Sequence, residues 1–293
     1  MHSAAAKPPF LLRLGTFVRF SHTVFALPFA LVAMLLAGGG RVAPSVGGWI
    51  VASAVAARTL AMCFNRLVDW EIDKLNPRTE GRHKLVSKAQ AWGVLSASAL
   101  SVFVATYHLN TLCFILSPVM IAILCFYSLT KRFTAFSHFF LGLALAVAPV
   151  GAWVAVRGSL LDPQPFLLGA AVLVWTFGFD LIYSTLDTDF DRAQGLFSFP
   201  SRFGIPSALR LAKWLHVVAG LGFVLFGLAA HLSWGYATAC LVTLGALVWE
   251  HRLAASLNLG QINVAFFQIN ALVSTTLLLG TLVDLKVWQL VSF

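Results

Sequence analysis

Acidic and basic side chains are concentrated in two short stretches of a chain that is otherwise strongly apolar. The first stretch, residues 58–88, reads RTLAMCFNRLVDWEIDKLNPRTEGRHKLVSK. On a helix, Asn65, Asp69 and Asp73 share one face, because their spacing of four residues is close to one helical turn. Two carboxylates four residues apart repel each other on an isolated helix. We therefore expect a positive partner at this face, and a hard divalent cation that takes oxygen ligands is the usual candidate.

A second stretch, FDLIYSTLDTDFDRAQG, repeats this arrangement. Asp187 and Asp191 again form a pair four residues apart. Asp180 and either Tyr183 or Ser184 fall on the same helical face. Together the two stretches hold eight of the eleven acidic residues in the chain. Such a concentration favours a binding site over a solvated surface.

Each of these acidic side chains also has a structural interpretation. Carboxylates at a helix end can be solvated or paired with neighbouring Arg and Lys side chains. Asp180 is expected to lie deeper than the others, where it could serve the site or only hydrogen-bond a neighbouring helix. Glu71 and Asp189 lie off the two faces, and we expect them to be solvated.

The composition excludes a soluble globular protein. Over 293 residues the chain is 59% hydrophobic and 11% charged, with a mean hydropathy of +0.85. These values are typical of a polytopic membrane protein, and we expect one transmembrane domain over residues 1–293. The net charge of +9 would suggest a nucleic-acid partner for a soluble protein. Here the enrichment of Lys and Arg in cytoplasmic loops explains it, so no nucleic-acid partner is expected.

The apolar segments predict an all-α fold with about nine transmembrane helices. A cleaved signal peptide is the alternative for the first segment, but the charged stretch of about twenty residues before it favours a span. The predicted spans cover residues 24–40, 46–68, 89–107, 112–129, 136–156, 166–186, 212–230, 236–249 and 264–285.

The distribution of Lys and Arg predicts the orientation of these spans. With the N-terminus inside, sixteen of the twenty lie inside or at an inner helix end, and Arg58 lies within a span. Only Arg41, Arg157 and Lys286 fall outside. This asymmetry predicts that both acidic stretches are cytoplasmic. The inner residues are Lys7, Arg13, Arg19, Arg66, Lys74, Arg78, Arg82, Lys84, Lys88, Lys131, Arg132, Arg192, Arg202, Arg210, Lys213 and Arg252.

Three motifs in this chain resemble those of the UbiA superfamily of intramembrane prenyltransferases. NRLVDWEID resembles its first Asp-rich motif, N-x-x-x-D-x-x-x-D, and DLIYSTLDTDFD resembles its second, Y-x-x-x-D-x-x-x-D. YSLTKRFT, residues 127–134, resembles its Y-x-x-x-K-R-x-T element. The likeness extends over nearly the whole chain. It implies helices around a central cavity and transfer of a polyprenyl group from polyprenyl diphosphate to a small aromatic acceptor within the membrane lipid.

The resemblance also implies the roles of site residues. Asp69, Asp73, Asp187 and Asp191 would be catalytic and would hold Mg²⁺, which commonly bridges carboxylates to substrate phosphates. Lys131 and Arg132 would bind the diphosphate, although such a pair can also be only a topology signal. The other expected substrate-binding residues are Arg58, Asn65, Arg78, Arg82, Asp180 and Tyr183.

Arg58 stands seven residues before Asn65, so it lies on the same helical face, about 10 Å deeper at a rise of about 1.5 Å per residue. An arginine in hydrocarbon costs several kcal/mol unless it faces a polar cavity. Its place resembles that of an arginine in the 4-hydroxybenzoate branch of the family. We therefore expect Arg58 to orient the aromatic acceptor. His22, near the first span, is either a second acceptor contact or an interfacial histidine.

The chain departs from the family pattern after each acidic motif. It has Arg82-His83-Lys84-Leu85 where many relatives have R-P-L, and GLFSFPSRFG at 195–204 where many have G-x-K-S-T. Arg192 or Arg202 is a candidate to replace the missing lysine. The FSHTVFALPFAL, FNRLVD and SFPSRFG segments are most similar to 4-hydroxybenzoate polyprenyltransferase-like proteins of the futalosine route to menaquinone.

Two functions are compatible with these features. The first is an enzyme of ubiquinone or menaquinone biosynthesis in the bacterial inner membrane, with 4-hydroxybenzoate or a hydroxynaphthoate as acceptor. The second is an ion-coupled secondary transporter, because intramembrane carboxylates also serve ion relays. The sequence does not indicate the prenyl length, the oligomeric state or the general base that restores aromaticity.

Overall fold

The computed structural model of this chain describes residues 8–291, and side chains as far as residue 286. Lys7, one of the basic residues predicted to be cytoplasmic, lies outside this range. The described chain is built from helices, with no strand in that range. The long helices are α2 (Leu27–Ala37), α3 (Pro44–Val68), α5 (Lys88–Leu109), α6 (Thr111–Thr130), α7 (Ser137–Arg157), α8 (Gln164–Ser184), α11 (Ile205–Ala229), α12 (Trp234–Ala254) and α14 (Asn270–Val291).

Short helical segments fill most of the connections. The α-helical ones are α1 (Phe10–Phe17), α4 (Trp70–Leu75), α9 (Thr188–Ala193), α10 (Phe199–Phe203) and α13 (Leu259–Val264). The others are the 3₁₀ turns η1 (Phe20–Phe25), η2 (Glu80–Lys84) and η3 (Thr185–Asp187) and the π-helical turn η4 (Ala265–Ile269).

Eight helical segments within the described residues are long and apolar enough to cross a membrane. They confirm eight of the nine predicted spans. The predicted span at 236–249 corresponds to α12, a helix of 21 residues that packs against α14. The mean hydropathy of α12 is lower than that of the other eight segments, because polar and aromatic side chains occupy its two ends. The chain is thus an integral membrane protein, with about nine long helices in the part that the structure describes.

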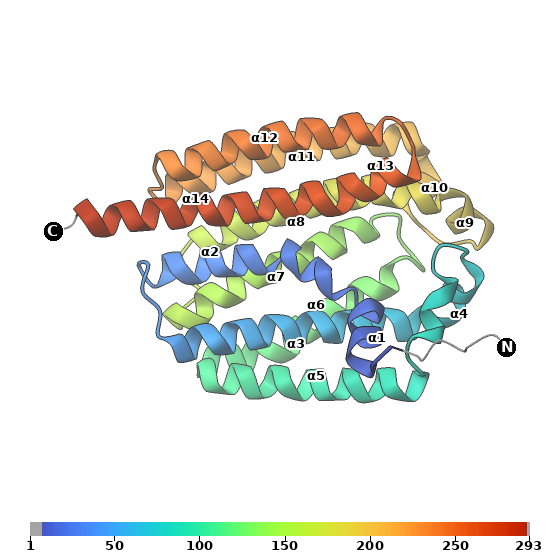
Figure 1. The fold of residues 1–293 in the computed structure, drawn as a ribbon, viewed down its shortest axis with the longest axis horizontal. Helices are drawn as coiled ribbons and strands as arrows, with labels where there is room; N and C mark the ends of the chain where they lie inside the picture. The colour runs from blue at the N-terminus through green and yellow to red at the C-terminus, as the bar shows by residue number, and fades with distance from the viewer. Residues whose placement is uncertain (1–7, 292–293) are drawn as a thin grey trace.

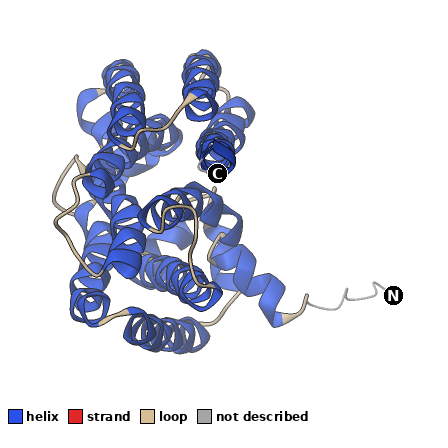
Figure 2. Ribbon diagram, turned by 90° about the vertical axis from the view of Figure 1, so that its left-hand side faces the viewer, coloured by secondary structure: helices blue, strands red, loops and turns tan. Residues whose placement is uncertain are grey.

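The long helices lie side by side, and the short segments α1, α4, α9, α10 and α13 gather at one end of the bundle (Figure 1). Viewed along the bundle, most helices are seen end-on (Figure 2). α3 and α8 both finish at the end that carries the short segments. The fold therefore brings together two acidic stretches that are more than one hundred residues apart in the chain.

α8 lies at the centre of the packing and contacts α7 and α11 most extensively. Its Trp175 packs against Phe29 of α2 and against Phe179, and all three side chains are buried. Gly142 of α7 allows a close approach to α8, because a Cβ there would lie 2.4 Å from the Leu173 carbonyl oxygen of α8. Small residues commonly permit such contacts between membrane helices.

Neither acidic stretch is one continuous α-helix, although Asn65 still lies beside Asp69, four residues later, as their spacing predicts. α3 ends at Val68, and Asp69 (φ −91°, ψ 14°) connects it to α4. α8 ends at Ser184 and continues through the η3 turn into α9. Beyond the interruption at Asp69, Asp73 of α4 lies beside Arg66 of α3 and Arg82 of η2.

Candidate active site

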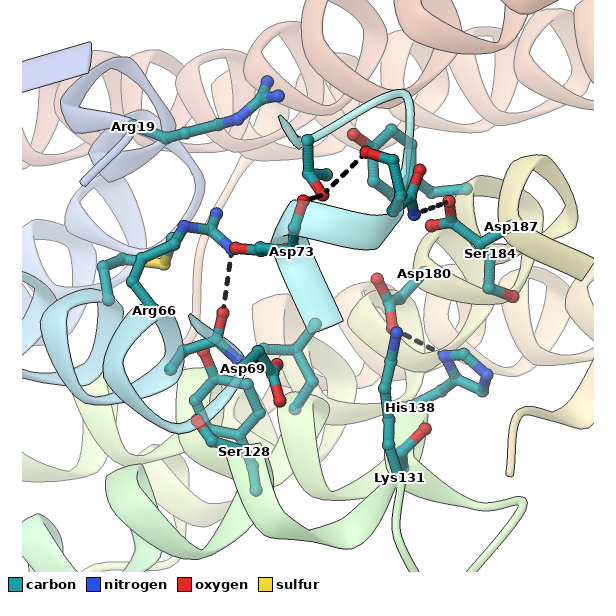
Figure 3. A pocket seen from close by; sticks show the side chains of 18 of the residues that line it. Arg19, Arg66, Asp69, Asp73, Ser128, Lys131, His138, Asp180, Ser184 and Asp187 are labelled. Atoms are coloured by element: carbon teal, nitrogen blue, oxygen red, sulfur yellow. Dashed lines mark hydrogen bonds and ion pairs between the residues drawn. The ribbon is translucent and has the colours of Figure 1, made fainter. Parts of the chain in front are cut away.

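A cavity of about 220 Å³ lies at the end of the bundle where α3 and α8 finish. Six cationic and five anionic side chains line it, and Figure 3 shows aspartates of both acidic stretches around it. Eleven of the twelve predicted site residues line this cavity: Arg58, Asn65, Asp69, Asp73, Arg78, Arg82, Lys131, Asp180, Tyr183, Asp187 and Asp191.

Arg132, the twelfth, supports the cavity from outside. Its Nη2 donates to Asp69 Oδ1 at 2.9 Å and to the Val68 carbonyl at 3.1 Å. Asn65 Nδ2 donates to the other Asp69 oxygen at 3.3 Å. Burial raises the pKa of the Asp69 carboxyl, and nearby Lys131 and Arg132 oppose that rise. Arg132 therefore orients Asp69 and counters its desolvation.

Asp73 faces two arginines. Arg82 Nη1 donates to its two oxygens at 3.0 and 3.3 Å, and Arg66 Nη1 lies 3.5 Å from Oδ2. Burial and the neighbouring Arg66 lower the pKa of Arg82 to about 10, so Arg82 stays charged at neutral pH. Arg66 is itself buried, and its Nε has no hydrogen-bond partner within the described residues. The two like charges beside one carboxylate leave this wall of the cavity able to take a further anion.

Asp187 joins the two acidic stretches. Arg78 binds it through Nε, 3.0 Å from Oδ1, and through Nη2 to Oδ2. Asn76 Nδ2 also donates to Oδ1, at 3.1 Å. Arg78 Nη1 donates to the Tyr183 hydroxyl at 2.6 Å. This two-point Arg–carboxylate contact fixes the loop after α4 against the end of α8.

Asp180 lies on α8 and pairs with a buried histidine. His138 Nδ1 is 2.6 Å from Asp180 Oδ2, and the Phe199 N–H points to His138 Nε2 at 3.5 Å. Because Nε2 accepts, Nδ1 carries the proton and donates to Asp180. Figure 3 shows His138, Asp180 and Lys131 on one side of the cavity. Asp180 therefore both hydrogen-bonds the neighbouring helix α7 and belongs to the lining of the cavity.

Asp191 and Lys131 complete the polar lining. Asp191 is buried, and its Oδ2 has no hydrogen-bond partner in the part of the chain that the structure describes. Burial alone would lower the pKa of the Lys131 ammonium, but Asp191, Asp187 and Asp69 raise it overall. Lys131 is thus held charged among carboxylates.

The carboxylate oxygens are suitable donors for a hard divalent cation. Asp191 supplies a buried oxygen with no other partner among the described residues. No group of three or more His, Cys, Asp or Glu side chains within those residues is close enough to hold one ion. The residues therefore fit a cation bound by one or two carboxylates, with the remaining ligands supplied by an anionic substrate and water.

Apolar cavities continue from the polar one. A cavity of about 80 Å³ shares His22, Arg58 and Tyr127 with it and is otherwise lined mostly by Ala, Leu and Met. A third, of about 210 Å³, shares Ala54 and Ala148 with the second. The lining therefore changes from ionic to apolar along the length of the bundle.

Arg58 lies where the ionic and apolar cavities meet. Its Nε is buried and has no hydrogen-bond partner among the described residues. A guanidinium does not deprotonate in proteins, so this side chain requires a polar or anionic partner within the cavity.

Aromatic side chains form the wall beside this junction. Phe25, Phe179 and Phe266 make a triangle with ring centroids 5.5 to 5.7 Å apart. Tyr183 stacks on Phe266 at 3.9 Å. His22 packs against Phe25 and Phe266, at 5.1 and 5.3 Å, so it belongs to this wall rather than to an outer interface.

Several lining residues were not predicted from the sequence as site residues. Arg66 had a usable signal, because it precedes Asp73 by seven residues and so shares its helical face. The sequence contains no comparable signal for Asn76, His138 or Phe266, because only the folding of the chain brings them to the cavity. Arg19 was predicted only as a cytoplasmic basic residue.

Other candidates lie outside the cavity. Arg192 is largely exposed and faces Asp189, and Arg202 stacks on Phe197 at 4.0 Å, so neither replaces the missing lysine in this structure. Glu71 pairs with Lys residues at the surface, and Asp189 is fully exposed, as expected.

The sequence profile of the UbiA prenyltransferase family matches residues 26–272. The chain belongs to this family. A UbiA homolog from Aeropyrum pernix K1 has the same fold, with a TM-score of 0.82 and 33% identity over 90% of this chain and 98% of that one. A UbiA homolog from Archaeoglobus fulgidus, solved with DMAPP and Mg²⁺, shares the fold at a TM-score of 0.64 and 16% identity, covering 90% of this chain and 99% of that one.

Curated relatives of this UbiA-family chain include enzymes named for 4-hydroxybenzoate. The mitochondrial 4-hydroxybenzoate polyprenyltransferase of Caenorhabditis elegans is 31% identical over 68% of this chain and 56% of its own length. The 4-hydroxybenzoate octaprenyltransferase of Burkholderia pseudomallei (strain 668) is 26% identical over 85% of this chain and 87% of its own. The chain spans only about half the length of the C. elegans and Arabidopsis thaliana relatives.

Proposed function

We propose that this protein transfers a polyprenyl group from a polyprenyl diphosphate to an aromatic acceptor, with Mg²⁺ as the cofactor. The observation that carries the proposal is the continuous change from an ionic cavity to apolar cavities within one bundle. A prenyl diphosphate has the same division, with a charged head and a hydrocarbon tail. The names of the curated relatives and the fold shared with a DMAPP- and Mg²⁺-bound homolog support the proposal.

The diphosphate binds in the polar cavity in this proposal. Asp69, Asp73, Asp187 and Asp191 would hold Mg²⁺, with one or two of these carboxylates to each ion. When bound, the metal neutralises the diphosphate and makes it a better leaving group. Charge-assisted hydrogen bonds to the diphosphate come from the cations of the lining, and arginine adds a planar two-point geometry. These cations are Arg66, Arg78, Arg82 and Lys131.

The prenyl tail occupies the apolar cavities. Loss of diphosphate leaves an allylic cation at the junction, beside the triangle of Phe25, Phe179 and Phe266. Aromatic faces attract cations, and the effect is strongest where water is excluded. The wall thus stabilises the cation until the acceptor carbon attacks.

The acceptor is 4-hydroxybenzoate or a hydroxynaphthoate, which places the protein in ubiquinone or menaquinone biosynthesis. Arg58 holds the acceptor through its carboxylate, because its guanidinium faces the junction of the two cavities and its Nε has no partner within the described residues. In this proposal the protein lies in the bacterial inner membrane. The Lys and Arg distribution favours an orientation with the N-terminus and the acidic stretches on the cytoplasmic side.

The ion-coupled transporter is the weaker alternative. Transport sites lie near the membrane midplane, at interrupted helices. Asp69 and Asp187 instead follow the ends of α3 and α8, where they are held by Arg132 and Arg78. This position supports chemistry at the membrane surface.

The test is a transfer assay with detergent-purified protein, geranyl diphosphate, Mg²⁺ and either 4-hydroxybenzoate or 1,4-dihydroxy-2-naphthoate. We expect a prenylated acceptor, detected by mass spectrometry, that is absent without Mg²⁺. Diphosphate release without a prenylated acceptor would reject these two acceptors but not the class. Neither product nor diphosphate release, with donor bound, would contradict the proposed function.

A further inference from the structure

A buried polar network lies behind the aromatic wall, outside the residues that line the cavity. Its centre is Glu250 of α12, which is 0% exposed. Asn270, the first residue of α14, donates from Nδ2 to Glu250 Oε1 at 3.1 Å. His216 of α11 approaches Glu250 Oε2 at 3.6 Å and His251 at 3.1 Å. Burying a carboxyl among membrane helices is costly, so a specific role for Glu250 is expected.

Asn270 closes the π-helical turn η4, Ala265–Ile269. Its Nδ2 also lies 3.0 Å from the Phe266 carbonyl and 3.3 Å from the Ala265 carbonyl. A π turn contains one residue more than an α turn and so disturbs the regular backbone bonding at that point. The Asn270 amide supplies a donor for carbonyls in this turn, and Glu250 fixes the amide in place.

Phe266 extends from this turn into the wall of the cavity. It completes the triangle with Phe25 and Phe179 and stacks on Tyr183, whose hydroxyl accepts from Arg78. If the segment reverted to a regular α-helix, the residues before Asn270 would rotate by about 100°. Phe266 would then leave the wall, and Tyr183 would lose its stacking partner.

His216 connects the same network to α8. Its ring occupies the space beside Gly178, where an added Cβ would lie 2.3 Å from His216 Cδ2. His216 Nε2 is 3.3 Å from the Trp175 carbonyl of α8. The network therefore contacts two of the three elements that form the aromatic wall, α8 and η4; the third is η1, which carries Phe25.

We propose that Glu250 and Asn270 are positioning residues that hold the π-helical turn in the register that places Phe266 in the reaction cavity. The proposal rests on the proposed function for the catalytic consequence, but the effect on the turn does not. Neither residue lines the cavity, so each acts through Phe266.

The first test measures the turn without any substrate. Hydrogen–deuterium exchange at residues 265–271 should be faster in Asn270→Ala than in the wild type and near wild type in Glu250→Gln, which keeps an oxygen acceptor for Asn270. Asn110→Ala is the matched control, because Asn110 caps α6 and bonds the end of α7 far from the turn. Unchanged exchange in Asn270→Ala, or an equal increase in Asn110→Ala, would overturn the proposal.

The second test is a double-mutant cycle on kcat for prenyl transfer. Asn270→Ala and Phe266→Ala should each lower kcat about tenfold or more, and their combination should lower it little further, because both remove the same interaction. The affinity for a non-reactive geranyl thiolodiphosphate should change less than about threefold in Asn270→Ala, since the Asp and Arg side chains are intact. Fully additive losses would overturn the proposal.

If Asn270→Ala does not fold, Glu250→Leu against Glu250→Gln provides the same comparison. Faster exchange at the turn in Glu250→Leu but not in Glu250→Gln would support the proposal. Equal exchange in the two variants would contradict it. A wild-type protein without prenyl-transfer activity would contradict the proposed function, while the exchange measurement would still decide the role of the turn.

Discussion

Asp187 has the most extensive contacts of the aspartates in the cavity, with both Arg78 and Asn76 on its carboxylate. Asp191 has the fewest, with one buried oxygen unpartnered among the described residues. The sequence predicted both as site residues, because carboxylates repeated at helical spacing near an apolar segment are a strong signal. It did not predict Asn76 or His138, because their places depend on how the loops and helices pack.

Replacing the aspartates one at a time tests their role. Asp69→Ala, Asp73→Ala, Asp187→Ala and Asp191→Ala should each lower the rate of prenyl transfer by about 100-fold or more, because each removes a metal ligand. Asp189→Asn is the matched control: Asp189 is exposed, and its loss should change the rate less than about twofold. Rates near wild type in any two alanine variants, with the protein folded, would contradict the metal-clamp assignment.

Substitutions of Arg58 test acceptor binding separately from donor binding. Arg58→Ala should raise the KM for the acceptor or lower kcat by about tenfold or more, with little change in donor affinity, because Arg58 lies at the apolar side of the polar cavity. Arg58→Lys should restore only part of the activity, since lysine lacks the planar fork. The measurement is steady-state kinetics with each substrate varied. Weaker donor binding with an unchanged acceptor KM would refute this role.

At the scale of elements, hydropathy predicted the long helices well. A segment of about twenty apolar residues forms a helix in the membrane, because only a helix satisfies its backbone hydrogen bonds within the segment. It did not predict the breaks at Asp69 and after Ser184, nor the π turn at Ala265–Ile269. These departures are fixed by ion pairs and side-chain contacts between segments, which periodicity within one segment does not encode.

The contact between α7 and α8 gives a prediction at this scale. Gly142→Ala should lower the melting temperature, at a cost of roughly 1–3 kcal/mol, because the new Cβ would meet the Leu173 carbonyl of α8. Gly151→Ala, on the same helix, has nothing within 4 Å of the added Cβ, and should be neutral or stabilise by up to about 1 kcal/mol. Thermal unfolding in detergent measures both. Equal effects of the two substitutions would show that the close approach is not a constraint.

For the whole molecule, the apolar cavities predict how the protein accommodates the prenyl chain. Their depth could not be predicted from the sequence, because it depends on the distances between helices. Ala54 lines both apolar cavities, whereas Ala52 of the same helix is exposed on the outer face.

Ala54→Trp should therefore lower kcat/KM for long-chain donors by about tenfold or more relative to geranyl diphosphate, because the indole fills the tail cavity. Ala52→Trp should leave the preference for chain length unchanged. A competition assay with donors of different length measures the ratio. The same ratio in both variants would mean that the tail lies elsewhere.

The central claim is that the two acidic stretches together bind one Mg-diphosphate. The most direct measurement is calorimetric titration of purified protein with geranyl thiolodiphosphate, with and without Mg²⁺, in the wild type, Asp73→Asn and Asp187→Asn. We predict binding that requires Mg²⁺ in the wild type and is weakened about tenfold or more by either substitution, since each removes a charge from a different stretch. Binding of equal strength without Mg²⁺, or undiminished in either variant, would contradict the claim.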